Sequence, residues 1–120
     1  MIDSNLISIQ NCITNRLESA AIGDRWLAGV IGAAPSHYSK SPALWNAAFD
    51  DLGMEAIYLP FDVDASRLRD LVAVLRNNDR FMGINVTVPH KVRIMDFLDE
   101  LDLGVQRIQA VNTVVKDHAG

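Results

Sequence analysis

One stretch of the sequence decides the fold that we expect, and it reads Gly83-Ile84-Asn85-Val86-Thr87-Val88-Pro89-His90-Lys91. Its first half is apolar and β-branched, which is typical of a buried strand. Pro89 is suited to open a helix, and Lys91 would then lie one turn inside that helix. Asn85, Thr87 and Lys91 are the polar groups of the stretch. They fall at the end of the predicted strand, where open α/β sheets keep their ligands.

Strands and helices alternate on both sides of this stretch. Short apolar runs predict strands at residues 26–32, 56–63, 81–88 and 110–115. Apolar residues at helical spacing predict helices at residues 6–21, 41–53, 64–77 and 89–98, and they leave 99–109 ambiguous. Pro60 favours an edge position or a bulge for the second strand. The alternation predicts a three-layer α/β/α domain with a mainly parallel sheet.

Two helix starts carry capping signals. Ser41 is followed by Pro42, and Asp64 precedes the third helix. The helix that begins at Ser41 would bury its apolar residues, namely Leu44, Ala47, Ala48 and Leu52. We divide the chain into a helical extension, residues 1–24, and a main domain, residues 25–120.

The composition indicates a soluble globular protein of 120 residues, with 49% hydrophobic and 22% charged residues. A net charge of −4 argues against a nucleic-acid or anionic-membrane surface, for which a basic stripe is expected. No apolar run is long enough to span a bilayer, and the N-terminus lacks the basic region of a signal peptide. With Cys12 as the single cysteine, we expect a cytoplasmic protein without an internal disulfide.

Metal and nucleotide signatures are missing from the sequence. The three histidines, His37, His90 and His118, lack metal-ligand spacing, and we expect each to be structural or exposed. The glycines of residues 29–34 have the wrong spacing for a dinucleotide-binding turn or a Walker loop. We therefore expect no metal and no cofactor to be bound by these residues.

Three polar clusters lie at or after predicted strand ends, which meet at one edge of a parallel sheet. Hydroxyls and amides both donate and accept hydrogen bonds, and a lysine adds a point charge, so the edge suits a small hydroxylated or carboxylated ligand. The clusters are Ser39 with Ser41, then Asn85 and Thr87 with Lys91, and finally Asn112 with Thr113.

Each cluster residue also has a purely structural interpretation, which the sequence leaves open. A serine or threonine at such a position can cap a helix, an asparagine can satisfy backbone groups, and a lone lysine can be a solvated surface residue. These interpretations apply to Ser39, Ser41, Thr87, Lys91 and Asn112. Trp45 is expected in the core.

Taken together, the clusters resemble the N-terminal, substrate-binding domain of shikimate dehydrogenases. Three stretches carry the resemblance, in the same order and at similar separation, and it covers residues from about 27 to 120. They are Ser39-Lys40-Ser41-Pro42 with Asn46 and Phe49 behind it, the stretch from Gly83 to Lys91, and Ala110-Val111-Asn112-Thr113.

The resemblance implies that domain's fold and a part in the NADP-dependent interconversion of 3-dehydroshikimate and shikimate, on the route to aromatic amino acids. Lys91 would be the catalytic lysine at the hydroxyl that becomes a ketone, where a placed amine can take up the proton that the oxygen sheds. The substrate-binding residues carried over by position are Ser39 and Ser41 for the carboxylate, and Asn85, Thr87, Lys91 and Asn112 for the ring hydroxyls and the reacting region.

The sequence departs from the family pattern in three places. Tyr38 stands where the family usually has histidine, with His37 one place earlier, and Trp45 stands where histidine is common. These changes would reshape the pocket or shift preference toward quinate. The aspartate that partners the family's lysine follows the last strand, and Asp117 comes too early to match it.

The nucleotide-binding domain that would hold NADP is not expected within these residues. The chain would then need that domain, in the same or another chain, for turnover, and alone it would be inactive. The alternative is a free-standing, non-catalytic module that binds shikimate or quinate. The sequence predicts no oligomeric state.

Overall fold

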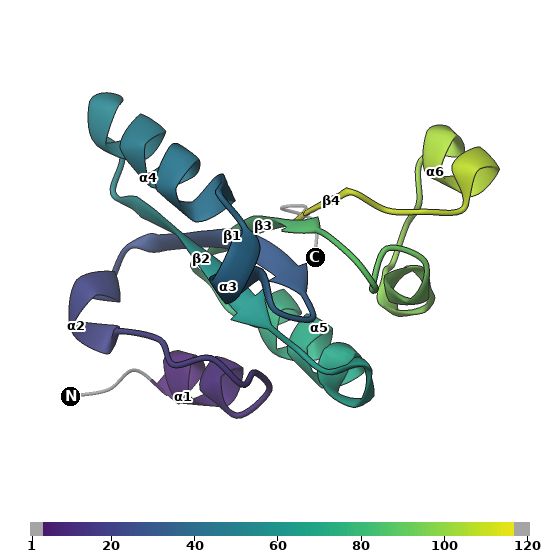
Figure 1. Cartoon of the computed structure of the whole chain (residues 1–120), viewed down its shortest axis with the longest axis horizontal. Coiled ribbons are helices and arrows are strands. Elements are labelled where there is room, and N and C mark those ends of the chain that lie inside the picture. Colours follow the sequence, from purple (N-terminus) through teal and green to yellow (C-terminus); the bar gives the residue numbers. More distant parts are fainter. Residues whose placement is uncertain (1–3, 117–120) are drawn as a thin grey trace.

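The computed structural model describes residues 4–116 and contains one mixed sheet of four strands in the order β2-β1-β3-β4 (Figure 1). β1 pairs in parallel with β2 on one side and β3 on the other, whereas β4 runs antiparallel to β3. This confirms the predicted α/β fold with a mainly parallel sheet. The strands are β1 (Trp26–Gly32), β2 (Ala56–Asp62), β3 (Phe81–Val86) and β4 (Thr113–Val115).

Helices cover both faces of the sheet. Figure 1 shows α4 (Ser41–Asp51) on one face, and α1 (Ser4–Gln10) and α5 (Leu68–Arg76) on the other. The larger core lies under α1 and α5, where Leu27 and Ile31 of β1 are fully buried. The smaller core lies under α4, and its buried members are Val30, Phe49, Ala56 and Tyr58.

The prediction of a single helix at residues 6–21 is wrong. This segment divides into α1 and the short α2 (Ser19–Ile22), with a loop between them. The loop forms because Gln10 uses its side chain to bond the backbone of Asn15 and Leu17, at 2.8 and 2.9 Å. Local side-chain bonds of this kind compete with helix continuation.

The N-terminal segment nevertheless shares the main core. Its buried residues pack in the same cluster as Leu71 and Leu75 of α5, which sit in the layer below the sheet. The boundary between residues 24 and 25 stays a prediction. The N-terminal members of the cluster are Leu6, Ile9, Cys12, Ile13 and Ile22.

The outer edge of β2 is sealed by two asparagine side chains. Asn46 of α4 accepts from the Tyr58 N–H at 2.7 Å and donates to the Tyr58 carbonyl at 3.0 Å. Asn15 binds the same edge further along the strand. It donates to the Pro60 carbonyl at 2.9 Å and accepts from the Asp62 N–H at 2.8 Å. Pro60 lies on this edge strand as predicted, where its missing N–H leaves no gap in the pairing.

α4 turns a different face to the core than its apolar pattern predicts. Leu44 and Leu52 are 69% and 72% exposed, and Phe49 is the buried residue. Trp45 is 47% exposed rather than in the core. The bond between Asn46 and the edge of β2 sets this rotation of the helix, because it places Asn46 against the sheet.

The segment after β3 differs from the predicted helix at residues 89–98. The Val88–Pro89 peptide bond is cis, and the chain runs through a turn into a 3-10 helix, η2 (Arg93–Phe97). The ambiguous segment contains α6 (Leu103–Ile108), capped by the Asp102 carboxylate. The predicted cap at Asp64 is confirmed, since its side chain accepts from Ser66 N–H ahead of η1 (Ala65–Arg67) and α5.

The remaining elements are short. α3 (Pro35–Tyr38) forms one helical turn inside the segment expected as a loop, with Pro35 at its start. Among the described residues, no helix has the length and apolar character needed to cross a membrane.

We expect Asn46→Ala to lower the free energy of unfolding by about 1–3 kcal/mol, because it leaves the Tyr58 N–H and carbonyl without partners at the sheet edge. Urea denaturation followed by circular dichroism measures this. Asn11→Ala is the matched control, since Asn11 is exposed, and we expect a change within about 0.5 kcal/mol. Equal stability of Asn46→Ala and the wild type would contradict the role of Asn46 at the edge.

Candidate functional site

Backbone hydrogen bonds bring the second and third polar clusters to one edge of the sheet. The Thr87 N–H donates to the Ile31 carbonyl of β1 at 2.8 Å, which joins the ends of β3 and β1. On the other side, the Val86 N–H donates to the Asn112 carbonyl at 2.7 Å. The turn that carries Lys91 is held at the same edge, because the Lys91 carbonyl accepts a hydrogen bond from the Val111 N–H at 2.8 Å.

The third cluster reaches this edge by a different route than expected. Asn112 and Thr113 do not follow a parallel strand; Thr113 begins the antiparallel β4 and pairs with Asn85. The start of an antiparallel strand lies beside the end of its partner. The cluster therefore lies at the predicted edge.

Three side chains on the α4 face form a hydrogen-bonded chain, which we call the Tyr58–Thr113 relay. The Tyr58 phenol donates to Asn85 Oδ1 at 2.7 Å. Asn85 Nδ2 in turn donates to Thr113 Oγ1 at 3.1 Å. The relay runs from β2 through β3 to β4, and the Ser41 side chain at the start of α4 lies beside its first member.

Ser39 and Ser41 lie on either side of the α4 start. Ser39 Oγ accepts from the Ser41 N–H at 3.2 Å, while Lys40 occupies the capping position without a side-chain bond. Ser41 itself is the first helical residue. The prediction that Ser41 caps the helix is therefore wrong, and its hydroxyl is directed to Tyr58 instead.

The loop that carries Ser39 is anchored to the end of β2. Asp62, which is only 3% exposed, accepts from the Ser36 N–H at 2.8 Å and also from the Ser36 hydroxyl. A buried carboxylate bound in this way holds α3 against the sheet. The loop therefore leads into Ser39 from a fixed starting point.

Thr87 packs against the end of β1 rather than capping a helix. A Cβ on Gly32 would lie 2.4 Å from the Thr87 methyl group, so glycine is needed at this close approach. The Thr87 carbonyl accepts from the His90 N–H at 3.1 Å and closes the turn. No following helix receives a cap from Thr87.

Lys91 extends from this turn and is half-buried. Its neighbour His90 is only 2% exposed, and Nε2 lies 2.7 Å from the Val63 carbonyl, to which it donates as the N–H tautomer. His90 is thus structural, as predicted, and it fixes the turn. Among residues 4–116, the Lys91 ammonium forms no hydrogen bond or ion pair.

Tyr58 is the residue that sequence reasoning missed. It is 3% exposed, and burial raises its pKa to about 12, against the opposing effect of the Ser41 hydrogen bond. Trp45 stacks on its ring with centroids 5.7 Å apart and planes inclined by 8°. A tyrosine in an apolar strand needs a hydrogen-bond partner for its hydroxyl, and this requirement could have pointed to Tyr58 from the sequence.

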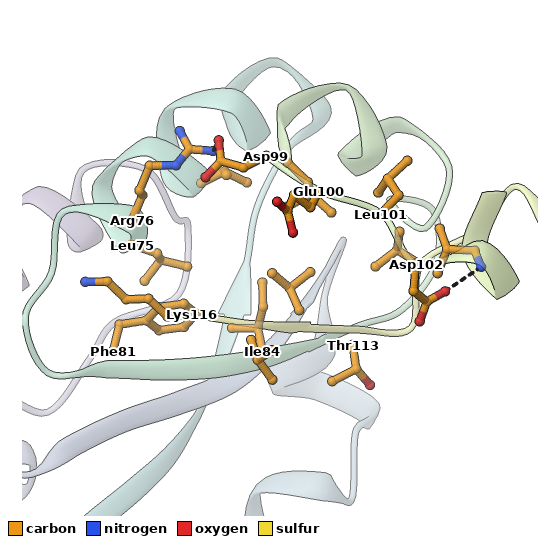
Figure 2. Close-up of a pocket in the computed structure, with 16 residues that line it drawn as sticks. Leu75, Arg76, Phe81, Ile84, Asp99, Glu100, Leu101, Asp102, Thr113 and Lys116 are labelled. Atoms are coloured by element: carbon orange, nitrogen blue, oxygen red, sulfur yellow. Dashed lines mark hydrogen bonds and ion pairs between the residues drawn. The ribbon is translucent and has the colours of Figure 1, made fainter. Parts of the chain in front are cut away.

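A cavity lies on the opposite face of the sheet from the relay, between α5, β3, β4 and the segment before α6 (Figure 2). It measures about 570 Å³, and Figure 2 shows its apolar floor at Phe81 and Ile84. Arg76, with Asp99 3.3 Å away, and Lys116 lie at its rim. None of the six predicted site residues lines this cavity.

The described residues contain no group of histidine, cysteine and carboxylate side chains placed to hold a metal ion. His37 is exposed, and His118 lies outside the described residues. The chemistry that the edge offers is therefore that of hydroxyls, amides and one ammonium. These groups can bind a carboxylate and orient ring hydroxyls.

An open, mainly parallel sheet with polar residues at one edge defines an α/β ligand-binding domain. The family described as the shikimate dehydrogenase substrate binding domain matches residues 30–114. The chain belongs to this family.

Individual relatives of this chain are also named as shikimate dehydrogenases. The shikimate dehydrogenase (NADP(+)) of Lysinibacillus sphaericus is 46% identical over 96 residues, which are 80% of this chain and 34% of that protein. A solved Listeria monocytogenes shikimate 5-dehydrogenase, in complex with shikimate and NAD, is 38% identical, with a TM-score of 0.74 over 88% of this chain and 35% of its own.

One structural neighbour carries another name. A ligand-free 5-ketofructose reductase of Gluconobacter is 30% identical, with a TM-score of 0.73 over 80% of this chain and 34% of its own. The chain spans about a third of the length of the curated relatives that it matches.

The relatives are named for NADP(+), but the β1 glycines of this chain do not form a cradle for its pyrophosphate. A Cβ on Gly29 would lie 2.4 Å from both the Leu59 carbonyl and the Phe61 ring, and the space beside Gly32 is filled by Thr87. Protein atoms thus occupy the space that a pyrophosphate needs beside a glycine-rich turn.

The raised pKa of Tyr58 predicts a stability loss at high pH. In the unfolded chain the phenol has its ordinary pKa of 10.0, and in the fold the pKa is about 12. Its contribution is therefore complete below pH 10 and declines as pH rises toward 12. Urea denaturation at several pH values in this window should show a steeper fall in the wild type than in Tyr58→Phe. Parallel pH dependences would contradict the assignment.

Proposed function

We propose that this chain binds shikimate and 3-dehydroshikimate, as the substrate-binding domain of an NADP-dependent shikimate dehydrogenase. The observation that supports it best is the meeting of the clusters at one sheet edge. The Ser41 side chain lies beside Tyr58, which hydrogen-bonds Asn85, and the backbone beside Thr87 and Asn112 is joined to the same strand end. The family match covers all six residues of the proposed site.

The proposed site divides into two parts. Ser39 and Ser41, at the start of α4, take the substrate carboxylate, since hydroxyl donors form strong hydrogen bonds to an anion. Thr87 and Asn112, beside the end of β3, contact the ring hydroxyls. Asn85 holds the centre between them with its amide.

Lys91 is proposed as the catalytic residue at the reacting oxygen. As the ketone is reduced, negative charge grows on that oxygen, and the ammonium stabilises it and then donates a proton. In the opposite direction the amine takes up the proton that the hydroxyl sheds. The half-buried position of Lys91, on a turn fixed by His90, suits this role.

The whole enzyme's reaction needs a nucleotide-binding part, in the same or another chain. We expect the purified 120-residue chain to show no NADP-dependent oxidation of shikimate, because protein atoms fill the space beside the β1 glycines Gly29 and Gly32. Following NADPH absorbance with shikimate and NADP(+) present measures this. Turnover that persists through purification would contradict the expectation.

A shikimate titration of the isotope-labelled chain, followed by amide NMR, tests the binding site. We expect saturable shifts at residues of the proposed site, with weaker effects from quinate. Lys91→Met should weaken shikimate binding about three- to tenfold, the cost of one hydrogen bond. Lys116→Met is the matched control, because its ammonium bonds the Asn78 carbonyl beside the opposite cavity, and it should bind like the wild type.

Two results would contradict the proposal. Shifts that cluster around Leu75 and Lys116 would place the ligand in the cavity of Figure 2 instead. A folded chain that shows no shifts at saturating shikimate would show that these residues do not bind it without further protein.

A further inference from the structure

The Tyr58–Thr113 relay has a direction, which follows from the proton inventory of its members. A phenol carries one proton, and Tyr58 gives it to Asn85 Oδ1 at 2.7 Å. Asn85 then donates through Nδ2 to Thr113 at 3.1 Å. Every member donates toward β4, an arrangement in which neighbouring hydrogen bonds strengthen one another.

The direction decides how the Asn85 amide is presented. An asparagine side chain can turn over and exchange its oxygen with its nitrogen unless a partner distinguishes them. The Thr113 hydroxyl cannot distinguish them, because it donates and accepts equally well. Tyr58 does, because its proton lies on Asn85 Oδ1 at 2.7 Å, and a phenol is a stronger hydrogen-bond donor and a weaker acceptor than an aliphatic hydroxyl.

Tyr58 can act in this way because its own position is fixed. Asn46 holds both of its backbone groups, at 2.7 and 3.0 Å, and Trp45 stacks on its ring. The side chain is buried at 3% exposure. With a pKa of about 12, the phenol keeps its proton at neutral pH and remains a donor.

We propose that Tyr58 is a positioning residue, which orients the Asn85 amide so that its N–H groups face the Asn112–Thr113 side of the substrate site. Nδ2 has two protons, and Thr113 takes one of them. The second N–H is the donor offered to a ring oxygen of the substrate. This inference deepens the proposed function and rests on it for the identity of the ligand.

Shikimate affinities of four chains test the proposal: the wild type, Tyr58→Phe, Asn85→Ala and the double variant. Tyr58→Phe removes the hydroxyl and keeps the ring against Trp45. We expect it to weaken binding about three- to tenfold, the cost of one hydrogen bond. In the Asn85→Ala background the same change should have almost no effect, because the amide that Tyr58 orients is gone.

Ser19→Ala is the matched control. It removes a hydroxyl from an exposed residue of α2 that lies outside the proposed site. We expect its affinity for shikimate to equal that of the wild type. Dispersed amide spectra of all variants would show that each remains folded.

Two affinity results would overturn the proposal. One is wild-type affinity in Tyr58→Phe. The other is an equal loss from Tyr58→Phe with and without Asn85, since a merely structural tyrosine would act independently of the amide.

A measurement without ligand separates this proposal from the proposed function. The Asn85 Nδ2 protons should exchange with water more slowly in the wild type and in Ser19→Ala than in Tyr58→Phe. If the wild type fails to bind shikimate, the proposed ligand is wrong for this chain, and this exchange rate still decides the role of Tyr58. Equal exchange in wild type and Tyr58→Phe would overturn that role.

Discussion

The structure depends most on the pairing of β3 with a strand on each side. β1 fixes its end through the Thr87–Ile31 hydrogen bond, and β4 fixes it through the bond between Val86 and Asn112. Because β1 is parallel and β4 antiparallel to β3, the end of β1, the end of β3 and the start of β4 meet. This pairing places the second and third polar clusters at one edge, and the Ser36–Asp62 hydrogen bond holds the loop that leads to the first.

The side chains around that edge are held by groups that contribute no ligand chemistry of their own. Asn46 seals the edge of β2 and at the same time fixes Tyr58, while Asp62 anchors the loop that leads to Ser39. His90 secures the turn that carries Lys91. A binding site needs such supporting contacts, because a side chain that is free to rotate loses affinity when it is ordered by the ligand.

Periodicity and turn residues were enough to predict the strands. β1 matches its predicted range, β2 is one residue shorter, and the edge position that Pro60 indicated is confirmed. The α/β class followed from the alternation of elements. These features depend on local sequence, and local patterns were therefore enough to predict them.

The failures concern contacts between distant residues. The apolar pattern of α4 pointed to Leu44 and Leu52, but the hydrogen bonds of Asn46 to β2 set the rotation of the helix. Pro89 favoured a helix start, whereas the Thr87 carbonyl and the buried His90 hold a turn there. No local pattern encodes these partners.

The site shows the same division. The three clusters were visible in the sequence as polar residues at strand ends, and the structure brings them to one edge. Tyr58 was invisible in that role because its hydrogen-bond partner, Asn85, comes from another strand. The roles of the six predicted residues in binding remain predictions.

A crystal structure of the 120-residue chain with shikimate would test the central claim most directly. The account predicts the carboxylate at the hydroxyls of Ser39 and Ser41, and the ring between Thr87, Lys91 and Asn112, with Asn85 still bonded to Tyr58. Shikimate bound instead in the cavity between α5 and β4 would contradict the account, as would an edge left empty at saturating ligand.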